Sequence, residues 1–470
     1  MGGFAQVRSM DYLFDFAAEV KRSKKRLGFF GLGETNIALM RELVALGCRD
    51  FYLRDERLSP PLPEDIPFAR LFFGKDAFTP AEDEIIFLSP SVRRERAEVR
   101  HLTSLGSTLS SDLDLFAGYL DNSTVTPKLG VTGSDGKSTT TELTYRILAS
   151  LGLDAPAIGN IGVPFCKRRQ GGFVAELSSF QLSYTSPRLD AAALTSITPN
   201  HLNWHSSIEE YYAAKTAIFR HADRAVIPSE LRSLYRELSR RMPVSLVSVN
   251  ESFAELSALA PSDCIFTLGG DCLMRGGRPF ISVADLCVRE RHNLFNMLTA
   301  AALVGDLADD TAIRAALSGF SGLPHRCERF LSVGGVTFID SSIDTTPSRT
   351  LSTLSSMPRG VRVILGGSGK GVSYAPLADA LASLAGRVSV YGRDREIIAE
   401  EISQKLLKSG VPLSVSEGFS EAVDLLLRDL NAGETVLLSP SATAYGEFRD
   451  YRERGDKFKD IILSRYGKKE

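Results

Sequence analysis

The sequence has no stretch of 18 consecutive apolar residues, so it offers no segment that could cross a membrane as a helix. Its start lacks the basic residues followed by an apolar run that mark a signal peptide, and we expect a cytoplasmic protein. Neither sign of charge is in excess, because 55 Lys and Arg face 57 Asp and Glu, a formal net charge of −2. This balance gives no reason to expect nucleic acid or an anionic membrane as a partner.

Cysteine is scarce and is not spaced for metal binding. The chain has 6 cysteines and none stands in C-x-x-C spacing, which favours free thiols in a reducing compartment over a disulfide framework or a zinc site. The 470 residues are 43% hydrophobic. Such a chain is long enough for roughly two to four domains, each with its own core.

The most informative segment is a glycine-rich turn between a predicted strand and a predicted helix. Residues 128–132 favour a strand, the sequence TGSDGKST follows, and leucines and isoleucines at helical spacing come next. Glycines let backbone N–H groups approach phosphate oxygens, Lys137 adds a full positive charge, and Ser138 can hold Mg²⁺. Val131 stands where the strict phosphate-loop pattern has its first glycine. We therefore favour a nucleotide triphosphate site, with a purely structural turn as the alternative.

An earlier segment imitates a dinucleotide-binding unit. Residues 26–30 and 51–53 favour strands that flank a turn over 31–36 and a helix over 37–46. Asp55 follows the second strand, where an acid can hold a ribose. The third glycine of the pattern is missing, which favours a smaller nucleotide or a sugar nucleotide over NAD, with an inert turn as the alternative.

Two charged residues fall within apolar patterns. Glu176 lies in an apolar strand, where a lone buried carboxylate needs a partner such as a metal ion. An edge strand with Glu176 in solvent is the alternative. Lys215 shares one predicted helical face with Ile208, Tyr212 and Phe219. By pattern alone, this lysine would extend along that face to water.

The rest of the chain alternates strands and helices, with a less distinct stretch over 223–288 that favours strands and turns around two Gly-Gly pairs. A helix starting at Arg291 places Asn293 and Asn296 on one face, where they could hold a flat base or simply cap and solvate the helix. Further strands are predicted over 85–88, 173–177, 192–198, 336–339, 361–365, 388–391 and 436–438, and helices over 376–385, 394–408 and 419–430.

These patterns predict an α/β protein of three domains. The first, over residues 1–118, is Rossmann-like. The second, over 119–322, is a central P-loop-type ATPase sheet with helices. The third, over 323–470, is again Rossmann-like.

Several motifs together resemble the Mur ligase family of ATP-dependent amide-forming enzymes. In family order they are TGSDGKSTTT, GNIGVPF, ELSSFQL, PNHLNWH, YYAAKTAIF, RHNLFN, GLPHR, LGGSGKG and LSPSATAYGEF. The family's phosphate loop has the short form TGTNGK[ST], so Val131 is no exception under this resemblance. The resemblance implies that D-glutamate is joined to UDP-N-acetylmuramoyl-L-alanine through an acyl phosphate, in peptidoglycan precursor synthesis. The first, central and last domains would bind the UDP substrate, ATP and glutamate, respectively.

The resemblance also implies roles for matching residues. Lys137, His201 and Lys215 would be catalytic. ATP would be bound by Gly133, Ser134, Asp135, Gly136, Lys137, Ser138, Thr139, Asn293, Asn296, Arg326 and Asp340. The UDP substrate would be bound by Thr35, Asp55, Ser89 and Asn160, and glutamate by Thr345, Lys370 and Thr443. Two Mg²⁺ ions would be held by Ser138, Glu176, His201 and Lys215, the last as a carbamate.

The chain departs from the family around the amino-acid pocket. Where the family commonly has N-D-S-K-A-T, the register puts Ser341 on its Asp and Ile343 on its Lys, and Asp340 lies one position earlier. Ala444 stands where a Ser usually contacts glutamate. Two alternatives therefore stay open: a sibling ligase that adds a diamino acid or extends folate with glutamate, and a non-catalytic nucleotide-binding scaffold. We expect a monomer that acts on small molecules.

Overall fold

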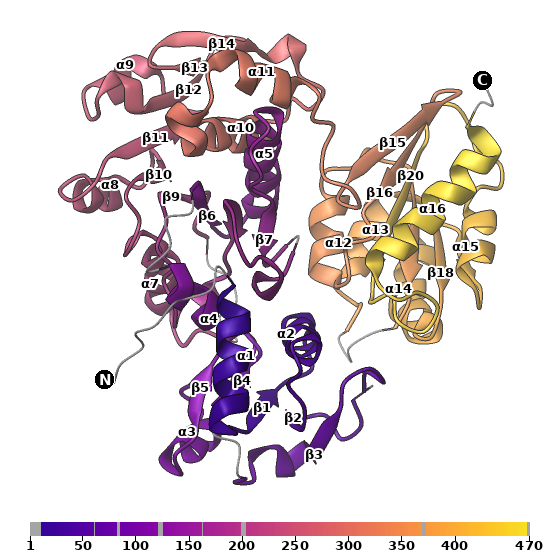
Figure 1. Cartoon of the computed structure of the whole chain (residues 1–470). Helices are drawn as coiled ribbons and strands as arrows, with labels where there is room; N and C mark the ends of the chain where they lie inside the picture. The colour runs from indigo at the N-terminus through magenta and orange to yellow at the C-terminus, as the bar shows by residue number, and fades with distance from the viewer. Residues whose placement is uncertain are drawn as a thin grey trace. The chain divides into compact units, whose positions relative to one another are not determined.

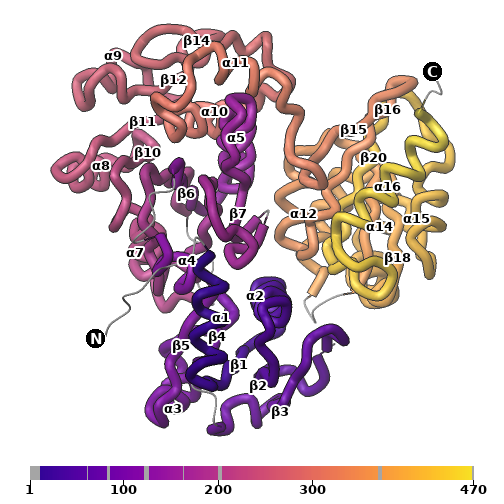
Figure 2. Tube along the Cα trace, viewed as in Figure 1, coloured from indigo at the N-terminus to yellow at the C-terminus, as the bar shows by residue number. Residues whose placement is uncertain are grey.

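The computed structural model describes residues 11–60, 62–81, 85–120, 126–161, 163–198, 204–368 and 373–467. These residues form an α/β structure with three mainly parallel sheets, which confirms the predicted fold class (Figure 1). The chain divides into two compact units, Met1–Phe320 with two sheets and Ser321–Glu470 with one (Figure 2). No helix in the described ranges is both long and apolar enough to cross a membrane. His201 and Lys370 lie outside these ranges.

The first sheet has five parallel strands in the order β3-β2-β1-β4-β5. Its strands are β1 (Leu27–Phe30), β2 (Phe51–Asp55), β3 (Phe68–Phe73), β4 (Ile85–Leu88) and β5 (Thr108–Ser110), and its helices are α1 (Tyr12–Ser23), α2 (Glu34–Ala45), α3 (Ala97–Ser104) and α4 (Asp112–Leu120). β1 and β2 are buried throughout, as expected for parallel strands with neighbours on both sides. The strands predicted here are confirmed. The helix begins at Glu34 rather than Ile37, so Thr35 lies in its first turn.

The second sheet has nine strands in the order β14-β13-β12-β11-β10-β9-β6-β8-β7, parallel from β7 to β12 and antiparallel beyond. Its strands are β6 (Lys128–Thr132), β7 (Ala157–Gly159), β8 (Phe173–Glu176), β9 (Ala191–Leu194), β10 (Ala225–Pro228), β11 (Val244–Ser248), β12 (Ile265–Gly269), β13 (Cys272–Arg275) and β14 (Arg278–Ser282). The turns predicted at the two Gly-Gly pairs are confirmed as the links β12–β13 and β13–β14. The strand predicted over 192–198 ends early, at Leu194.

Helices cover this second sheet, and three of them, α5, α7 and α10, carry predicted site residues. They are α5 (Lys137–Ser150), α6 (Ser179–Leu182), α7 (Ile208–Thr216), α8 (Arg232–Leu238), α9 (Phe253–Ser257), α10 (Arg291–Val304) and α11 (Asp310–Ser318). α5 packs against both α10 and α11 (Figure 1). This packing places the start of α5, where the phosphate loop ends, beside Asn296 of α10.

The third sheet has the order β15-β16-β20-β17-β18-β19 and is parallel except for β15. Its strands are β15 (Glu328–Val333), β16 (Val336–Asp340), β17 (Val361–Gly366), β18 (Ala385–Tyr391), β19 (Leu413–Val415) and β20 (Thr435–Ser441), and its helices are α12 (Pro347–Leu354), α13 (Leu377–Leu384), α14 (Arg395–Lys408), α15 (Phe419–Leu426) and α16 (Tyr451–Tyr466). Alternate residues of β17 enter two separate buried clusters, so both faces of the sheet are covered.

Leu437 tests the packing of this third sheet. Its side chain is fully buried in β20, between β16 and β17. Leu437→Ala should lower the free energy of unfolding by about 2–5 kcal/mol, because it removes buried methyl groups and leaves a cavity. Leu407→Ala on α14, where the side chain is 82% exposed, should change it by less than about 0.5 kcal/mol. Urea unfolding followed by circular dichroism measures both, and equal effects would contradict this assignment of the core.

Candidate functional site

The glycine-rich turn joins β6 to α5, as the sequence predicts. Gly133 and Gly136 have φ of 149° and 80°, in the region that favours glycine. A Cβ at Gly136 would lie only 2.4 Å from Asn296 Oδ1, so the loop can pack against α10 only with glycine there. Helix α5 begins at Lys137. Its N-cap residue, Gly136, has no side chain that could accept hydrogen bonds from the first N–H groups of the helix. The turn therefore directs a helix N-terminus, with its partial positive charge, toward the loop.

Lys137 folds back over this loop. Its Nζ donates to the carbonyl oxygens of Gly133 and Ser134, each at 2.7 Å. The next two residues, Ser138 and Thr139, are largely buried. The positive charge is thus held over the backbone of the turn, next to the helix N-terminus, where an anion such as phosphate binds favourably.

Residues beyond β9 and on α7 hold the loop from its other side. Ser134 Oγ lies 2.7 Å from the Tyr211 hydroxyl and 2.9 Å from the Thr198 carbonyl oxygen. The Asp135 N–H donates to Ser196 Oγ at 2.8 Å. The sequence analysis did not identify Tyr211 as a loop contact. Its spacing of four residues before Lys215, on the same helical face, was the available signal.

Glu176 ends β8 with a carboxylate that is 1% exposed. β8 lies between β6 and β7, so the edge-strand alternative is wrong. Asn160 Nδ2 donates to Glu176 Oε1 at 2.6 Å, whereas Oε2 accepts no hydrogen bond from the described residues. In the sheet register Glu176 pairs with Val131, just before the phosphate loop. A buried oxygen that lacks a donor beside a phosphate loop is suited to a hard cation such as Mg²⁺.

Lys215 is buried, with 2% of its surface exposed, so the expectation that it extends to water is wrong. Burial lowers the pKa of its amine to about 7; the charge of Lys137 lowers it as well, and Glu176 and Asp135 oppose the shift. Its Nζ also lies 4.9 Å from the ring centre of Tyr211. A large fraction of this amine is therefore uncharged near neutral pH.

The predicted stripe around Lys215 is only partly correct. Phe219 is buried, but Ile208 is 48% exposed and Tyr212 is half-buried. The buried residues of α7 are Tyr211, Ala214 and Lys215. The buried face of α7 therefore lies closer to Tyr211 than predicted. The prediction was based on four residues and left out Ala214, a small residue that is buried.

The two asparagines of α10 have different surroundings. Asn296 is buried and its Oδ1 accepts a hydrogen bond from Thr140 Oγ1 at 3.4 Å. Asn293 is half-buried and donates from Nδ2 to Glu290 Oε2 at 3.1 Å, at the helix start. Asn293 thus makes a contact at the helix start, whereas Asn296 faces α5 and the phosphate loop.

The first sheet groups Asp55 and Ser89 at the turn that begins at Gly31. A Cβ at Gly31 would lie 2.9 Å from Ser89 Cβ, so the turn and the end of β4 are in close contact. Asp55 Oδ2 accepts from the Leu32 N–H at 3.0 Å, and Arg57 donates to both carboxylate oxygens at 2.9 and 2.7 Å. Burial alone would raise the pKa of Asp55, but these hydrogen bonds and the Arg57 charge lower it overall. Arg57 was not identified from the sequence.

Asn36 explains why the third glycine of the dinucleotide pattern is absent. It is fully buried, and its Nδ2 donates to the carbonyl oxygens of Phe30, Gly31 and Phe87. The amide thereby ties β1 to β4 at the end of the sheet. Thr35 precedes it in the first turn of α2.

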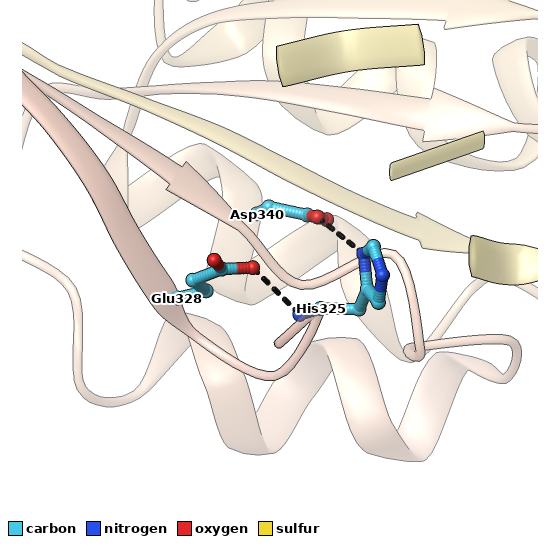
Figure 3. Close-up of side chains that lie close together, drawn as sticks. All are labelled: His325, Glu328 and Asp340. Carbon is cyan, nitrogen blue, oxygen red and sulfur yellow. Dashed lines mark hydrogen bonds and ion pairs between the residues drawn. The ribbon is translucent and has the colours of Figure 1, made fainter. Parts of the chain in front are cut away.

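In the second unit, His325, Glu328 and Asp340 have ligand atoms within 4.8 Å of one another (Figure 3). His325 Nδ1 lies 2.8 Å from Asp340 Oδ2, and the His325 N–H donates to Glu328 Oε2 at 2.8 Å. These residue types can hold a metal, but Lys459 Nζ already lies 2.8 Å from Glu328 Oε2 and 3.7 Å from Asp340 Oδ2. The group is an ion-pair network whose cation is the protein's own lysine.

Thr345 and Thr443, the described residues among those predicted for glutamate, lie near strand ends of the third sheet. The Thr345 N–H donates to the Ile343 carbonyl oxygen at 2.8 Å, just after β16. Thr443 follows β20, and its Oγ1 donates to the Ser368 carbonyl oxygen at 2.6 Å. Carboxyl ends of parallel strands are where such sheets bind ligands.

Asp344 is a buried acid that the sequence analysis did not identify. Its Oδ2 accepts from Thr353 Oγ1 at 2.7 Å and from Ser439 Oγ at 2.8 Å. Burial raises the pKa of its carboxyl group, whereas hydrogen bonds from Thr353, Ser341 and Ser439 lower it. The position matches an alanine of the family motif, so motif comparison gave no signal. Asp344 forms a side-chain hydrogen bond with Ser341, the residue that matches the Asp of the family motif. A carboxylate therefore lies next to that position.

Comparison with known proteins agrees with the resemblance. Residues 131–304 match the Mur ligase middle domain, and residues 325–442 match the Mur ligase glutamate ligase domain. The chain is similar to the UDP-N-acetylmuramoylalanine–D-glutamate ligase of Nitrosococcus oceani, with 32% identity over 92% of this chain and 95% of that protein. The Clostridium novyi protein of the same name is 28% identical, over 93% and 96%. A crystal structure of MurF from Acinetobacter baumannii has a similar fold, with a TM-score of 0.52, 18% identity and 93% of each chain covered.

Lys215 should make stability depend on pH. The pKa of its amine is about 7 in the folded protein and 10.5 ordinarily, so the folded state binds fewer protons and stability rises with pH between these values. Lys215→Met removes this contribution. The variant should be more stable than the wild type near pH 7, and the difference should shrink toward pH 10. Urea unfolding of both proteins in CO₂-depleted buffer measures it, and a difference that stays constant with pH would contradict the uncharged amine.

Proposed function

The chain belongs to the Mur ligase family, and from this premise we propose that it joins D-glutamate to UDP-N-acetylmuramoyl-L-alanine at the expense of ATP. The buried pair of Glu176 and Lys215 beside the phosphate-loop lysine carries the proposal. Support for the substrates comes from relatives of that name, which align along nearly the whole chain. The product would be a peptidoglycan precursor.

The reaction has two steps. A carboxylate oxygen of the UDP substrate attacks the γ-phosphorus of ATP, the bond to the ADP oxygen breaks, and an acyl phosphate forms. The amine nitrogen of D-glutamate then attacks the acyl carbon and loses a proton, and phosphate leaves. Carboxylate and triphosphate are both anionic, so the first step needs positive charge at the transferred group. Lys137 and the N-terminus of α5 would supply it.

The described donors of this unit suit one Mg²⁺ ion, and the family motifs imply a second. Ser138 and Glu176 would hold one, which suits the carboxylate oxygen that lacks a hydrogen-bond donor. His201 and Lys215 would serve the other. When bound, the ions would screen the repulsion between carboxylate and triphosphate. Lys215 would act as a carbamate, formed when its uncharged amine attacks CO₂ and loses a proton, and its low pKa makes that amine available.

The remaining assignments follow from the family motifs. ATP would be bound by Gly133, Ser134, Asp135, Gly136, Lys137, Ser138, Thr139, Asn293, Asn296, Arg326 and Asp340. The UDP substrate would be bound by Thr35, Asp55, Ser89 and Asn160, and glutamate by Thr345, Lys370 and Thr443. Residues 1–118, 119–322 and 323–470 would be the corresponding domains of a cytoplasmic monomer. Arg57 joins the UDP group because it holds Asp55 by two hydrogen bonds.

A substrate panel tests the proposed reaction. Purified protein is incubated with ATP, Mg²⁺, UDP-N-acetylmuramoyl-L-alanine and one of several amino acids: D-glutamate, L-glutamate, a diamino acid or D-alanine. Phosphate release and product mass should show ligation with D-glutamate alone. Turnover with another amino acid would instead identify a sibling ligase. ATP binding without turnover in any mixture, together with a Lys137→Ala variant that changes only ATP affinity, would identify a scaffold.

Carbamylation of Lys215 has its own test. Lys215→Ala should lower ligation at least about a hundredfold, the order expected when a group that acts on transition-state charge is removed. Acetate, a small carboxylate, should restore part of the activity. With ¹³C-bicarbonate, the wild type should show a carbamate signal that the variant lacks. Lys408→Ala, at an exposed lysine on α14, is the matched control and should leave rate and signal unchanged. Full activity of Lys215→Ala without acetate would exclude the carbamate.

A further inference from the structure

Arg326 lies in an unusual backbone turn just before β15. Its neighbours His325 and Cys327 have φ of 64° and 47°, the left-handed region that residues other than glycine rarely adopt. Such conformations persist where the surrounding structure holds them, and they are common at ligand sites. The contacts that hold this turn therefore indicate what keeps Arg326 in place.

Polar contacts fix both neighbours of Arg326. The His325 N–H donates to Glu328 Oε2 at 2.8 Å, and His325 Nδ1 lies 2.8 Å from Asp340 Oδ2 (Figure 3). The Cys327 N–H donates to Ser341 Oγ at 3.2 Å. The turn thus depends on two carboxylates, one on β15 and one on β16. Both are wholly or largely shielded from water, so their charges need compensation.

Helix α16 supplies that compensation at one point. Lys459 Nζ lies 2.8 Å from Glu328 Oε2 and 3.7 Å from Asp340 Oδ2, and its side chain is 16% exposed. Asp456 also lies within 3.8 Å of the ammonium but is mostly exposed. One lysine therefore bridges the two carboxylate oxygens that hold His325.

Gly455 permits this approach of α16. It lies four residues before Lys459, on the same helical face. A Cβ at Gly455 would lie 2.3 Å from His325 Nδ1 and 2.5 Å from Asp340 Oδ2. Only glycine lets the helix come close enough for Lys459 to reach both carboxylates.

We propose that Lys459 is a positioning residue for Arg326. Its charge keeps the Glu328 and Asp340 oxygens together, these oxygens hold His325 in its left-handed conformation, and the turn then fixes the backbone that carries Arg326. The inference rests on the proposed function, in which Arg326 contacts ATP. Without the lysine, the two carboxylates repel each other, the turn relaxes, and Arg326 leaves its place.

Lys459→Met in the full chain tests this. The KM for ATP should rise about tenfold, the lower end of the range found when a group that orients a ligand-binding residue is removed. The KM values for D-glutamate and the UDP substrate should stay within twofold. Lys459→Arg should recover most of the ATP effect, because a guanidinium can also bond two carboxylates. Lys457→Met, at an exposed lysine on the same helix, is the matched control and should match the wild type.

Two further measurements separate positioning from general disruption. Circular dichroism and urea unfolding report whether Lys459→Met is folded at the assay temperature. If it is not, Lys459→Gln, which removes the same charge but keeps a polar side chain near Glu328, replaces it and should raise the KM for ATP selectively. A folded variant with an unchanged KM for ATP, or with all three KM values raised equally, would overturn the proposal.

Calorimetric titration of ATP distinguishes this failure from failure of the proposed function. If the wild type binds ATP but ligates no D-glutamate, the proposed reaction is wrong. The dissociation constant for ATP still shows whether Lys459 affects nucleotide binding. It should rise about tenfold in both Arg326→Ala and Lys459→Met. If Arg326→Ala binds ATP as tightly as the wild type, Arg326 makes no contact worth positioning and the inference fails.

Discussion

The structure depends on charges that are buried beside the phosphate loop without full compensation. Glu176 has one oxygen with no hydrogen-bond donor among the described residues, and burial together with Lys137 pushes the pKa of Lys215 down to about 7. Such groups are unfavourable in a closed interior. The sheet tolerates them because β8, and Ile218 and Phe219 just after α7, belong to one extensive apolar cluster. Binding of cations and anions together would compensate these groups and stabilise the site. The ligation of a carboxylate with ATP brings both kinds of ion to it.

In the second unit, the buried charges around His325 are compensated by neighbouring charged groups. Around His325, each carboxylate already has a partner, and Lys459 balances both. Incomplete compensation thus accompanies Glu176 and Lys215, whereas the carboxylates that hold the His325 turn are compensated. The same residue types can form a metal site or an ion-pair network. His325, Glu328 and Asp340 could hold a metal ion by type and distance, but the ammonium of Lys459 lies next to their carboxylates and indicates an ion-pair network.

The sequence predicted those features that depend on local pattern. The strand over 85–88, the start of α5 and the burial of a carboxylate at Glu176 all follow from hydrophobic periodicity and glycine placement. Features that depend on residues distant in sequence were missed. Helix α16 has mainly charged residues and buries only Arg454, Gly455, Phe458 and Ile462. Lys459 contacts Glu328 and Asp340, which lie on strands more than a hundred residues earlier in the sequence. The roles of all the site residues stay predictions, and His201 and Lys370 also lie outside the described residues.

In the proposed function, the choice of amino acid depends on the third sheet rather than on the phosphate loop. Phosphoryl transfer to a carboxylate is common to the family, and the 18% identity to MurF at a TM-score of 0.52 reflects a shared fold alone. The loop after β16 differs from the family motif: Ile343 stands where the motif has a lysine, and the buried acid Asp344 bonds Ser341. The acidic group has thus moved within the loop, whereas the positive charge at 343 has gone. A carboxylate-bearing amino acid still needs a cation, and another strand end of the same sheet is where we expect it.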